Sequence, residues 1–322
     1  VNLEITFSIW FFYVLSKLQE VLFNRLGIAS TETLSAYEYS QPADITHQAA
    51  GAVIVLVLFG LWTARHHLAE VGRKLWHPKQ GVDDSEELLS YRTAVCGFFG
   101  SLLFVAVWLW RSGVPLVIVP ILLVVSLIFF ILVARVVAAG GVATARSPIV
   151  PAYFIISGFG TSMLGAKGLI ALTFTFIWQG ESRTSPMVAA SNGLKLAEET
   201  IKKGRRLIFW GMVTAILVTL FSSIWAILDL AYGYGGINTD QFFFGGAARY
   251  PFDNAAARIQ APEGPHWENW GYTGIGALVM GLLMVARQRF LWWPFHPLGF
   301  PISAVFGTMF FSVFLAWLLK TL

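Results

Sequence analysis

Charged residues are scarce in this sequence. Lys, Arg, Asp and Glu together make up 12% of the 322 residues, whereas a soluble domain usually carries about 25%. Hydrophobic residues make up 56%. A soluble fold of this length could not bury so much apolar surface, so the composition excludes an ordinary soluble domain and predicts an integral membrane protein.

Cysteine and the motifs of membrane enzymes are also scarce or missing. Cys96 is the one cysteine of the sequence, which excludes an intrachain disulfide bond. The sequence contains neither a His-Glu-x-x-His zinc site nor a Gly-x-Ser-x-Gly nucleophile turn, and its six histidines are scattered. We therefore predict that the chain is not an enzyme and holds no catalytic residue, cofactor or metal ion.

Long runs without charge are what the sequence does have. A helix needs about 20 apolar residues to cross a hydrocarbon core of about 30 Å. Unlike a β-barrel strand, the run Val53–Phe59 does not alternate in polarity. We predict an all-α fold, a polytopic transmembrane bundle of about seven to nine membrane segments that forms a single domain over residues 1–322 within a lipid bilayer. Six confident crossings are Ile45–Ala64, Thr93–Trp110, Ser112–Ala134, Leu207–Leu228, Asn269–Ala286 and Phe290–Leu319.

The basic residues behind the net charge of +4 concentrate in two loops, which is typical of membrane orientation rather than of nucleic-acid binding. Residues 65–92 and 183–206 are therefore predicted to be cytoplasmic, in a multi-pass protein of the inner (plasma) membrane. Residues 229–268 are acidic and aromatic and are predicted to face outward. Aromatic rings favour the headgroup zone, so this segment is either an interfacial loop or a lid over an outward-facing cavity.

Residues 147–180 are too short for the crossings that their surroundings demand. Arg135 and the basic loop 183–206 are both predicted on the cytoplasmic side, so the chain between them crosses an even number of times. Two crossings need about 40 residues. We predict a re-entrant or broken-helix hairpin that lines a solute path, with two short tilted helices as the alternative. The helix interrupters in this stretch are Pro148, Pro151, Gly158, Gly160, Gly165 and Gly168.

The N-terminal segment carries another pair of charges. Lys17 and Glu20 lie three residues apart, so on a helix they share a face and can pair. Residues 5–23 are predicted either to span the bilayer or to form an amphipathic helix at its surface. Ionisable residues at membrane depth are candidates for function because of their cost.

Small and polar residues of these two regions form the predicted substrate pathway. Glycine permits close approach of backbones, and neighbouring hydroxyl groups can bond to a solute. The predicted pathway residues are Lys17, Glu20, Gly158, Gly160, Thr161, Ser162, Lys167, Gln179, Glu181 and Arg183.

Three motifs, Leu3–Phe12 (LEITFSIWFF), Leu194–Glu198 (LKLAE) and Arg289–Gly299 (RFLWWPFHPLG), resemble an uncharacterised family of bacterial multi-pass membrane proteins. That family is distantly similar to oligopeptide transporters, and the resemblance covers nearly the whole chain. Members of the family are longer, so the resemblance implies that this chain matches their C-terminal half. It also implies a partner, a second membrane chain that supplies the missing N-terminal helices.

Interrupted helices near the bilayer midplane are typical of transport sites. We therefore predict a secondary transporter, or part of one, that moves a small organic solute or peptide. The alternative is a non-catalytic membrane subunit or scaffold of a larger complex, in which the glycines serve helix packing.

Overall fold

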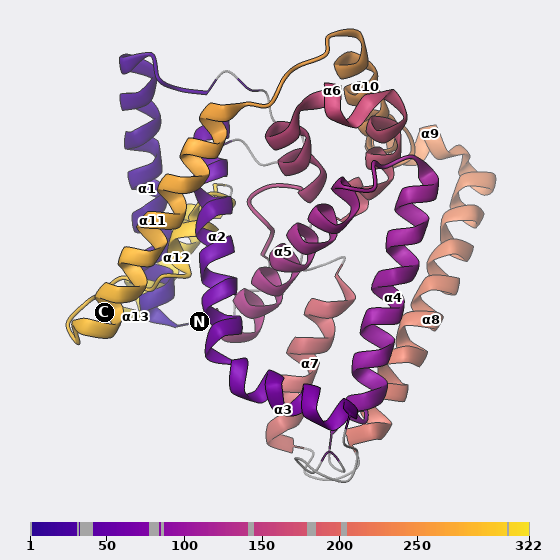
Figure 1. The fold of residues 1–322 in the computed structure, drawn as a ribbon, viewed down its shortest axis with the longest axis horizontal. Coiled ribbons are helices and arrows are strands. Elements are labelled where there is room, and N and C mark those ends of the chain that lie inside the picture. The colour runs from indigo at the N-terminus through magenta and orange to yellow at the C-terminus, as the bar shows by residue number, and fades with distance from the viewer. Residues whose placement is uncertain are drawn as a thin grey trace.

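The computed structural model describes residues 2–30, 32, 41–76, 84, 87–140, 145–178, 185–200, 205–307 and 309–321. Throughout these ranges the regular elements are helices, so the predicted all-α fold is confirmed. Figure 1 shows the helices arranged as a bundle, with α3 and α7 at one end and α6 and α10 at the other.

The first half of the chain forms α1 (Leu3–Leu26), α2 (Ala43–Thr63), α3 (Arg65–Trp76), α4 (Tyr91–Ser112), α5 (Ile118–Gly140), α6 (Pro151–Thr173) and the 3-10 turn η1 (Phe174–Ile177). The second half forms α7 (Pro186–Thr200), α8 (Arg205–Leu230), η2 (Ala231–Gly235), α9 (Gly236–Thr239), η3 (Phe242–Gly246), α10 (Ala247–Gln260), α11 (Trp267–Arg289), α12 (Gly299–Ser303) and α13 (Phe310–Thr321).

Seven helical segments of the described chain are long and apolar enough to cross a membrane, which agrees with the predicted range. By length and composition they are α1, α2, α4, α5, α6 with η1, α8 with η2, and α11, although α6 is broken at two glycines and is not one straight crossing. Helix α1 contains 24 residues, so of the two predictions for the N-terminal segment, its length favours a spanning helix.

The predicted crossing Phe290–Leu319 is wrong. The structure has a loop after α11, then the short helix α12, and then α13 with 12 residues. Three prolines, Pro294, Pro297 and Pro301, lie in this stretch, and proline removes a backbone donor and interrupts a helix. Counting uncharged residues overlooked these breaks.

The segment 229–268, predicted as a loop or lid, is largely helical. It contains the end of α8, the π-helical turns η2 and η3, and the helices α9 and α10. A true loop follows only after Gln260 and leads to α11. Helix α10 lies beside α6 (Figure 1) and contributes a side chain to the candidate functional site.

Helix α6 is broken at two glycines, Gly160 (φ 75°, ψ 164°) and Gly165 (φ 64°, ψ 170°). A continuous helix from Tyr153 to Phe176 would extend about 35 Å at 1.5 Å per residue. The ring centroids of these two residues lie 4.8 Å apart. The chain therefore turns back on itself, as predicted for a broken-helix hairpin in this region.

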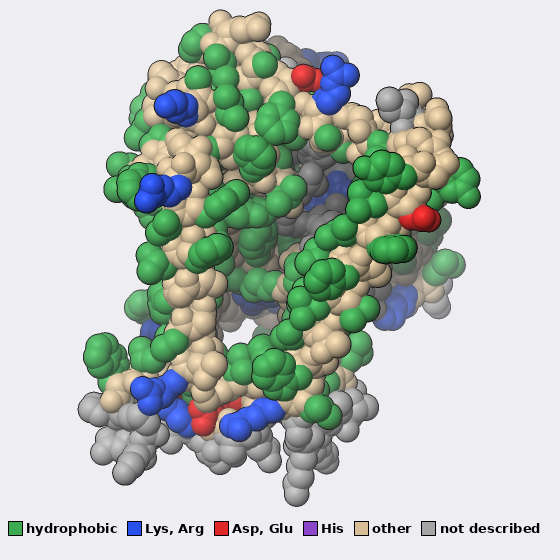
Figure 2. Space-filling view, turned by 90° about the vertical axis from the view of Figure 1, so that its right-hand side faces the viewer, with side chains coloured by type: hydrophobic (Ala, Val, Ile, Leu, Met, Phe, Trp, Pro, Cys, Tyr) green, Lys and Arg blue, Asp and Glu red, His purple; other side chains and the backbone are tan. Residues whose placement is uncertain are grey.

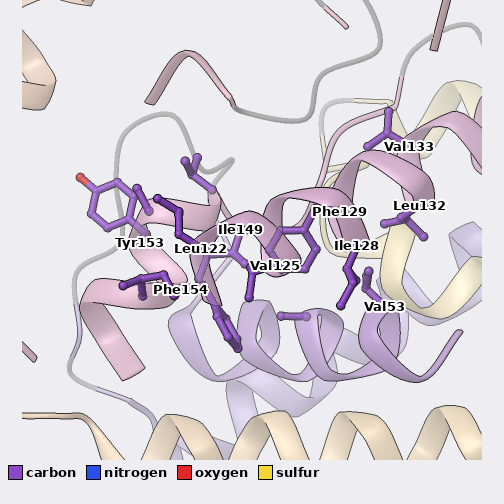
Figure 3. Close-up of a cluster of buried hydrophobic side chains, with 14 of the residues drawn as sticks. Val53, Leu122, Val125, Ile128, Phe129, Leu132, Val133, Ile149, Tyr153 and Phe154 are labelled. Atoms are coloured by element: carbon purple, nitrogen blue, oxygen red, sulfur yellow. The ribbon is translucent and has the colours of Figure 1, made fainter. Parts of the chain in front are cut away.

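The buried core lies between α2, α5 and the first arm of α6. Figure 3 shows Val53 of α2 beside Val125, Ile128 and Phe129 of α5. The rings of Phe129 and Phe154 meet edge to face with centroids 6.1 Å apart. This apolar packing holds the first arm of α6 against α5, close to α2.

Helices α4 and α8 form a loosely packed side of the bundle. In their most apolar windows, 6% of α4 and 0% of α8 is buried. Figure 2 shows apolar side chains along this face and a hollow in it. Most of the apolar surface of these two helices is thus available to lipid or to another membrane segment.

Candidate functional site

Two glycines allow α2 and α11 to cross in close contact. A Cβ atom on Gly51 would lie 1.9 Å from the backbone oxygen of Thr273, and one on Gly276 would lie 1.8 Å from that of Gln48. Small residues at such crossings let helix backbones approach in membranes. The crossing brings polar side chains of both helices within bonding distance inside an apolar bundle.

A buried group of polar side chains, which we call the Glu32 network, consists of Glu32, His47, Ser157, Asn269 and Thr273. Ser157 Oγ donates to Glu32 Oε2 at 2.8 Å, and Asn269 Nδ2 donates to the same oxygen at 2.5 Å. His47 Nε2 lies 3.2 Å from Ser157 Oγ and 3.7 Å from Glu32 Oε2. The side chains of Glu32 and His47 are 2% and 3% exposed, so the network is shielded from solvent.

Two hydroxyl groups from other helices flank the ring of His47. Ser157 Oγ lies 3.2 Å from Nε2, and Thr273 Oγ1 lies 3.4 Å from Nδ1. Each ring nitrogen of His47 therefore has a polar partner, one on α6 and one on α11.

Arg258 of α10 brings a second positive charge to the network. Its Nη2 lies 3.8 Å from Glu32 Oε1, and its Nη1 lies 3.2 Å from Glu263 Oε2. The guanidinium also lies over the ring of Tyr153 at 5.6 Å. Because Arg258 is 8% exposed, it depends on these carboxylates to offset the loss of hydration.

Residues 263–270, which comprise the end of the loop after α10 and the first turn of α11, cover the break in α6, and we call them the closing segment. Thr161 N donates to Glu263 O at 2.9 Å, and Glu263 N donates to Thr161 Oγ1 at 2.8 Å. His266 N donates to Ser157 O at 3.0 Å. Backbone groups freed by the helix break are thereby satisfied, as membrane depth requires.

The pocket beneath the closing segment is closed in this conformation. Its walls are formed by residues of α2, α6 and α11, and it has no space for a water molecule. Trp270 forms part of the wall, and its Nε1 donates to Gly158 O at 3.0 Å. Access to the Glu32 network from this side therefore requires the closing segment to move.

The Glu32 carboxyl has a lowered pKa. Burial raises its pKa, but the contact with His47, the hydrogen bond from Ser157 and the charges of His47 and His266 lower it by more. The net pKa lies below the ordinary value of 4.5, so the carboxylate form is stabilised in the folded protein.

We expect the stability supplied by Glu32 to depend on pH. A carboxyl with a lowered folded-state pKa stabilises the fold above its unfolded pKa, and this contribution is lost as the pH falls through the folded value. The difference in melting temperature between wild type and Glu32→Gln in detergent should therefore shrink below about pH 4.5.

Burial, helped by the charge of Arg287, lowers the pKa of His296 to about 4. The folded protein therefore favours the neutral ring, and the stability that this ring contributes is lost as the pH falls from 6.5 to about 4. Wild type and Glu32→Gln both contain His296, so its contribution to stability cancels when their melting temperatures are compared. A difference that stays constant down to pH 3 would contradict the role of the Glu32 charge.

The structure brings three of the predicted pathway residues, Gly158, Gly160 and Thr161, together at the helix break. Ser162 and Lys167 are exposed and lie outside the Glu32 network. The other predicted members either form a pair elsewhere or are not described. Lys17 and Glu20 pair on α1 with 2.8 Å between Nζ and Oε2, as predicted, and Gln179, Glu181 and Arg183 lie outside the described residues.

The sequence interpretation missed the charged centre of the site, Glu32, His47, Arg258 and Asn269. His47 lies within a run that was counted only as uncharged, next to Gln48 and Asp44. Three polar residues in the first turns of an otherwise apolar helix were the signal that could have marked this end of α2. Their partners are far away in sequence and could not be paired by spacing.

Comparison with known proteins gives a family without an activity. The family model described as "Family of unknown function (DUF6785)" matches residues 1–322. No curated protein and no solved structure matches the chain. The function has to be argued from the site itself.

Proposed function

Because the chain belongs to DUF6785, a family of unknown function, we propose from its own buried site that it is a secondary transporter, or part of one, for a small organic solute or peptide. The observation that carries the proposal is the break in α6 beside the Glu32 network. Broken helices beside buried ionisable residues are typical of solute sites in membrane proteins.

Opposite charges in the network suit a zwitterionic solute. Glu32 Oε1 has an ion-pair contact with Arg258 at 3.8 Å but no hydrogen bond among the described residues, and Asn269 Oδ1 has no hydrogen bond there either. When the closing segment opens, a solute carboxylate can replace Glu32 at Arg258, and a solute ammonium can replace Arg258 at Glu32. Such an exchange keeps every buried charge paired.

We also propose a non-enzymatic role, distant kinship with oligopeptide transporters and a location in the bacterial inner membrane. The family model covers the whole of residues 1–322 rather than a C-terminal half alone. A second membrane chain as partner would have a place to pack, because α4 and α8 leave their apolar faces open (Figure 2).

That open face also supports the alternative, a membrane subunit or scaffold of a larger complex. The two proposals differ in what they require of the site. A scaffold needs α8 and its neighbours for contact but does not require buried, mutually paired charges under a closing segment.

Uptake by the purified protein in liposomes tests the transporter proposal. We expect at least one member of a panel of radiolabelled amino acids, dipeptides and tripeptides to accumulate, and Arg258→Gln to abolish that accumulation because its carboxylate site is lost. Arg287→Gln, at a half-exposed pair with Glu4, is the matched control and should transport normally. Absence of uptake for the whole panel, together with co-purification of a stable membrane partner, would favour the scaffold.

A further inference from the structure

A second buried acid lies outside the Glu32 network. Asp44, in the first turn of α2, is 1% exposed. In the described part of the chain, neither of its carboxyl oxygens has a hydrogen-bond partner. A carboxylate removed from water needs a paired charge or several hydrogen bonds to offset its lost hydration. Around Asp44 the backbone amides of Asp44 and Ile45 offset only part of that loss, and burial outweighs them, so the surroundings suit the neutral acid.

Two glutamines beside Asp44 show the same lack of partners. Gln41 Oε1 and Gln48 Nε2 are buried and, within the described residues, have no hydrogen bond. Gln48 lies one helical turn after Asp44 and therefore on the same face of α2. Nearly all buried polar atoms in native proteins are bonded. Three unsatisfied side chains at one end of a helix thus mark a place that a small polar species visits.

The charges around Asp44 come from three helices. Glu20 of α1 and His47 of α2 both act on it electrostatically, and Asp44 acts on Tyr272 of α11. The neighbouring α12 has the sequence GFPIS and contributes no titratable group. A negative Glu20 disfavours a second carboxylate, and both ring nitrogens of His47 already lie against Ser157 and Thr273.

We propose that Asp44 is a proton-binding site, occupied in this closed conformation and emptied into water when the helices packed against α2 move away from it. The inference rests on the proposed function, because it names the proton as the ion that drives transport. A metal ion fits less well, since the described residues contain no group of three or more His, Cys, Asp and Glu that could hold one. A hard cation also needs several oxygen ligands, whereas a proton needs one.

The position of Asp44 links proton binding to the solute site. It lies one turn from His47 on the same helix, and His47 contacts both α6 and α11 through Ser157 and Thr273. A movement of α2 that exposes Asp44 would also separate these partners. One helix therefore connects the release of the proton with the opening of the Glu32 network.

Infrared spectroscopy of the purified protein in nanodiscs tests the proposal without any substrate. At pH 7 we expect the carbonyl band of a protonated carboxylic acid in wild type, its loss in Asp44→Asn and its displacement in Asp44→Glu. Glu20→Gln, which removes a nearby acid, should keep the band. A wild-type spectrum without the band, or an unchanged band in Asp44→Asn, would overturn the assignment.

Thermal unfolding separates a proton from a metal cation at the same residue. As the pH rises above 3.8, the ordinary value for an aspartate, wild type should lose more stability than Asp44→Asn, because only wild type must bury a carboxylate. At fixed pH, increasing sodium concentrations should leave the thermal stability of wild type unchanged. If sodium stabilised wild type but not Asp44→Asn, the assignment of a proton site would be wrong. If the infrared band is present but no solute is taken up, the proposed transport is contradicted, while Asp44 still binds a proton.

Discussion

Replacing Gly160 by alanine should destabilise the protein by several kcal/mol more than the same change at Gly165. Both glycines have positive φ and an extended ψ, a backbone region essentially restricted to glycine, and entering it costs another residue about 1–3 kcal/mol. At Gly165 nothing lies within 4 Å of an added Cβ. Gly165→Ala is therefore the matched control that measures backbone strain alone.

Gly160 has an additional restriction, because the closing segment lies against it. An added Cβ would meet the backbone of Gly264 at 2.7 Å and that of Pro265 at 2.8 Å. These atoms cannot turn away as a flexible side chain would, so the segment has to shift. The shift would weaken its hydrogen bonds to Thr161 and Ser157, each of which contributes about 1 kcal/mol.

Thermal or chemical unfolding in detergent measures the two variants side by side. We expect the free energy of unfolding to fall by about 2–3 kcal/mol more in Gly160→Ala than in Gly165→Ala. Because both variants have the same backbone strain, this difference measures what the closing segment contributes to stability. Protease cleavage between Glu263 and Trp267 should also become faster in Gly160→Ala only. Equal losses in the two variants would mean that the closing segment does not stabilise the break.

The break in α6 could be predicted because it follows from local chemistry and length. Glycines and prolines interrupt helices wherever they occur, and residues 147–180 are too short for two crossings. The pairing of Lys17 with Glu20 was predictable for the same reason, since helix geometry alone places residues three apart on one face. Both features are determined by neighbours in the sequence.

The Glu32 network could not be predicted in this way. Asn269 is 237 residues from Glu32, and Ser157 is 110 residues from His47. These contacts exist because Gly51 and Gly276 let α2 and α11 touch, and a glycine in one helix does not reveal which other helix it faces. The predicted crossing Phe290–Leu319 is wrong for a simpler reason. A run without charge indicates only that a segment is apolar, whereas the prolines in this run interrupt the helix.

Removing the charge of Glu32 should be the most damaging single change at the site. Glu32→Gln keeps the shape of the side chain but leaves Arg258 with less compensating charge in a buried region. Breaking a buried pair by removing one partner typically costs about 3–5 kcal/mol. We expect Arg258→Gln to have a similar cost, since it leaves Glu32 without its guanidinium contact at 3.8 Å.

The double variant separates pairing from other effects. If Glu32 and Arg258 stabilise each other, the combined loss should be smaller than the sum of the single losses by about 1–3 kcal/mol. The pair Glu4–Arg287 is a control of the same chemistry, with 2.6 Å between Oε2 and Nη2 but 51% and 35% of the side chains exposed. Water screens such a pair, so its coupling should stay below about 1 kcal/mol despite the shorter distance. Additive losses at Glu32 and Arg258 would show that their charges act independently, and the site would then have no mutual pair for a zwitterionic solute to replace.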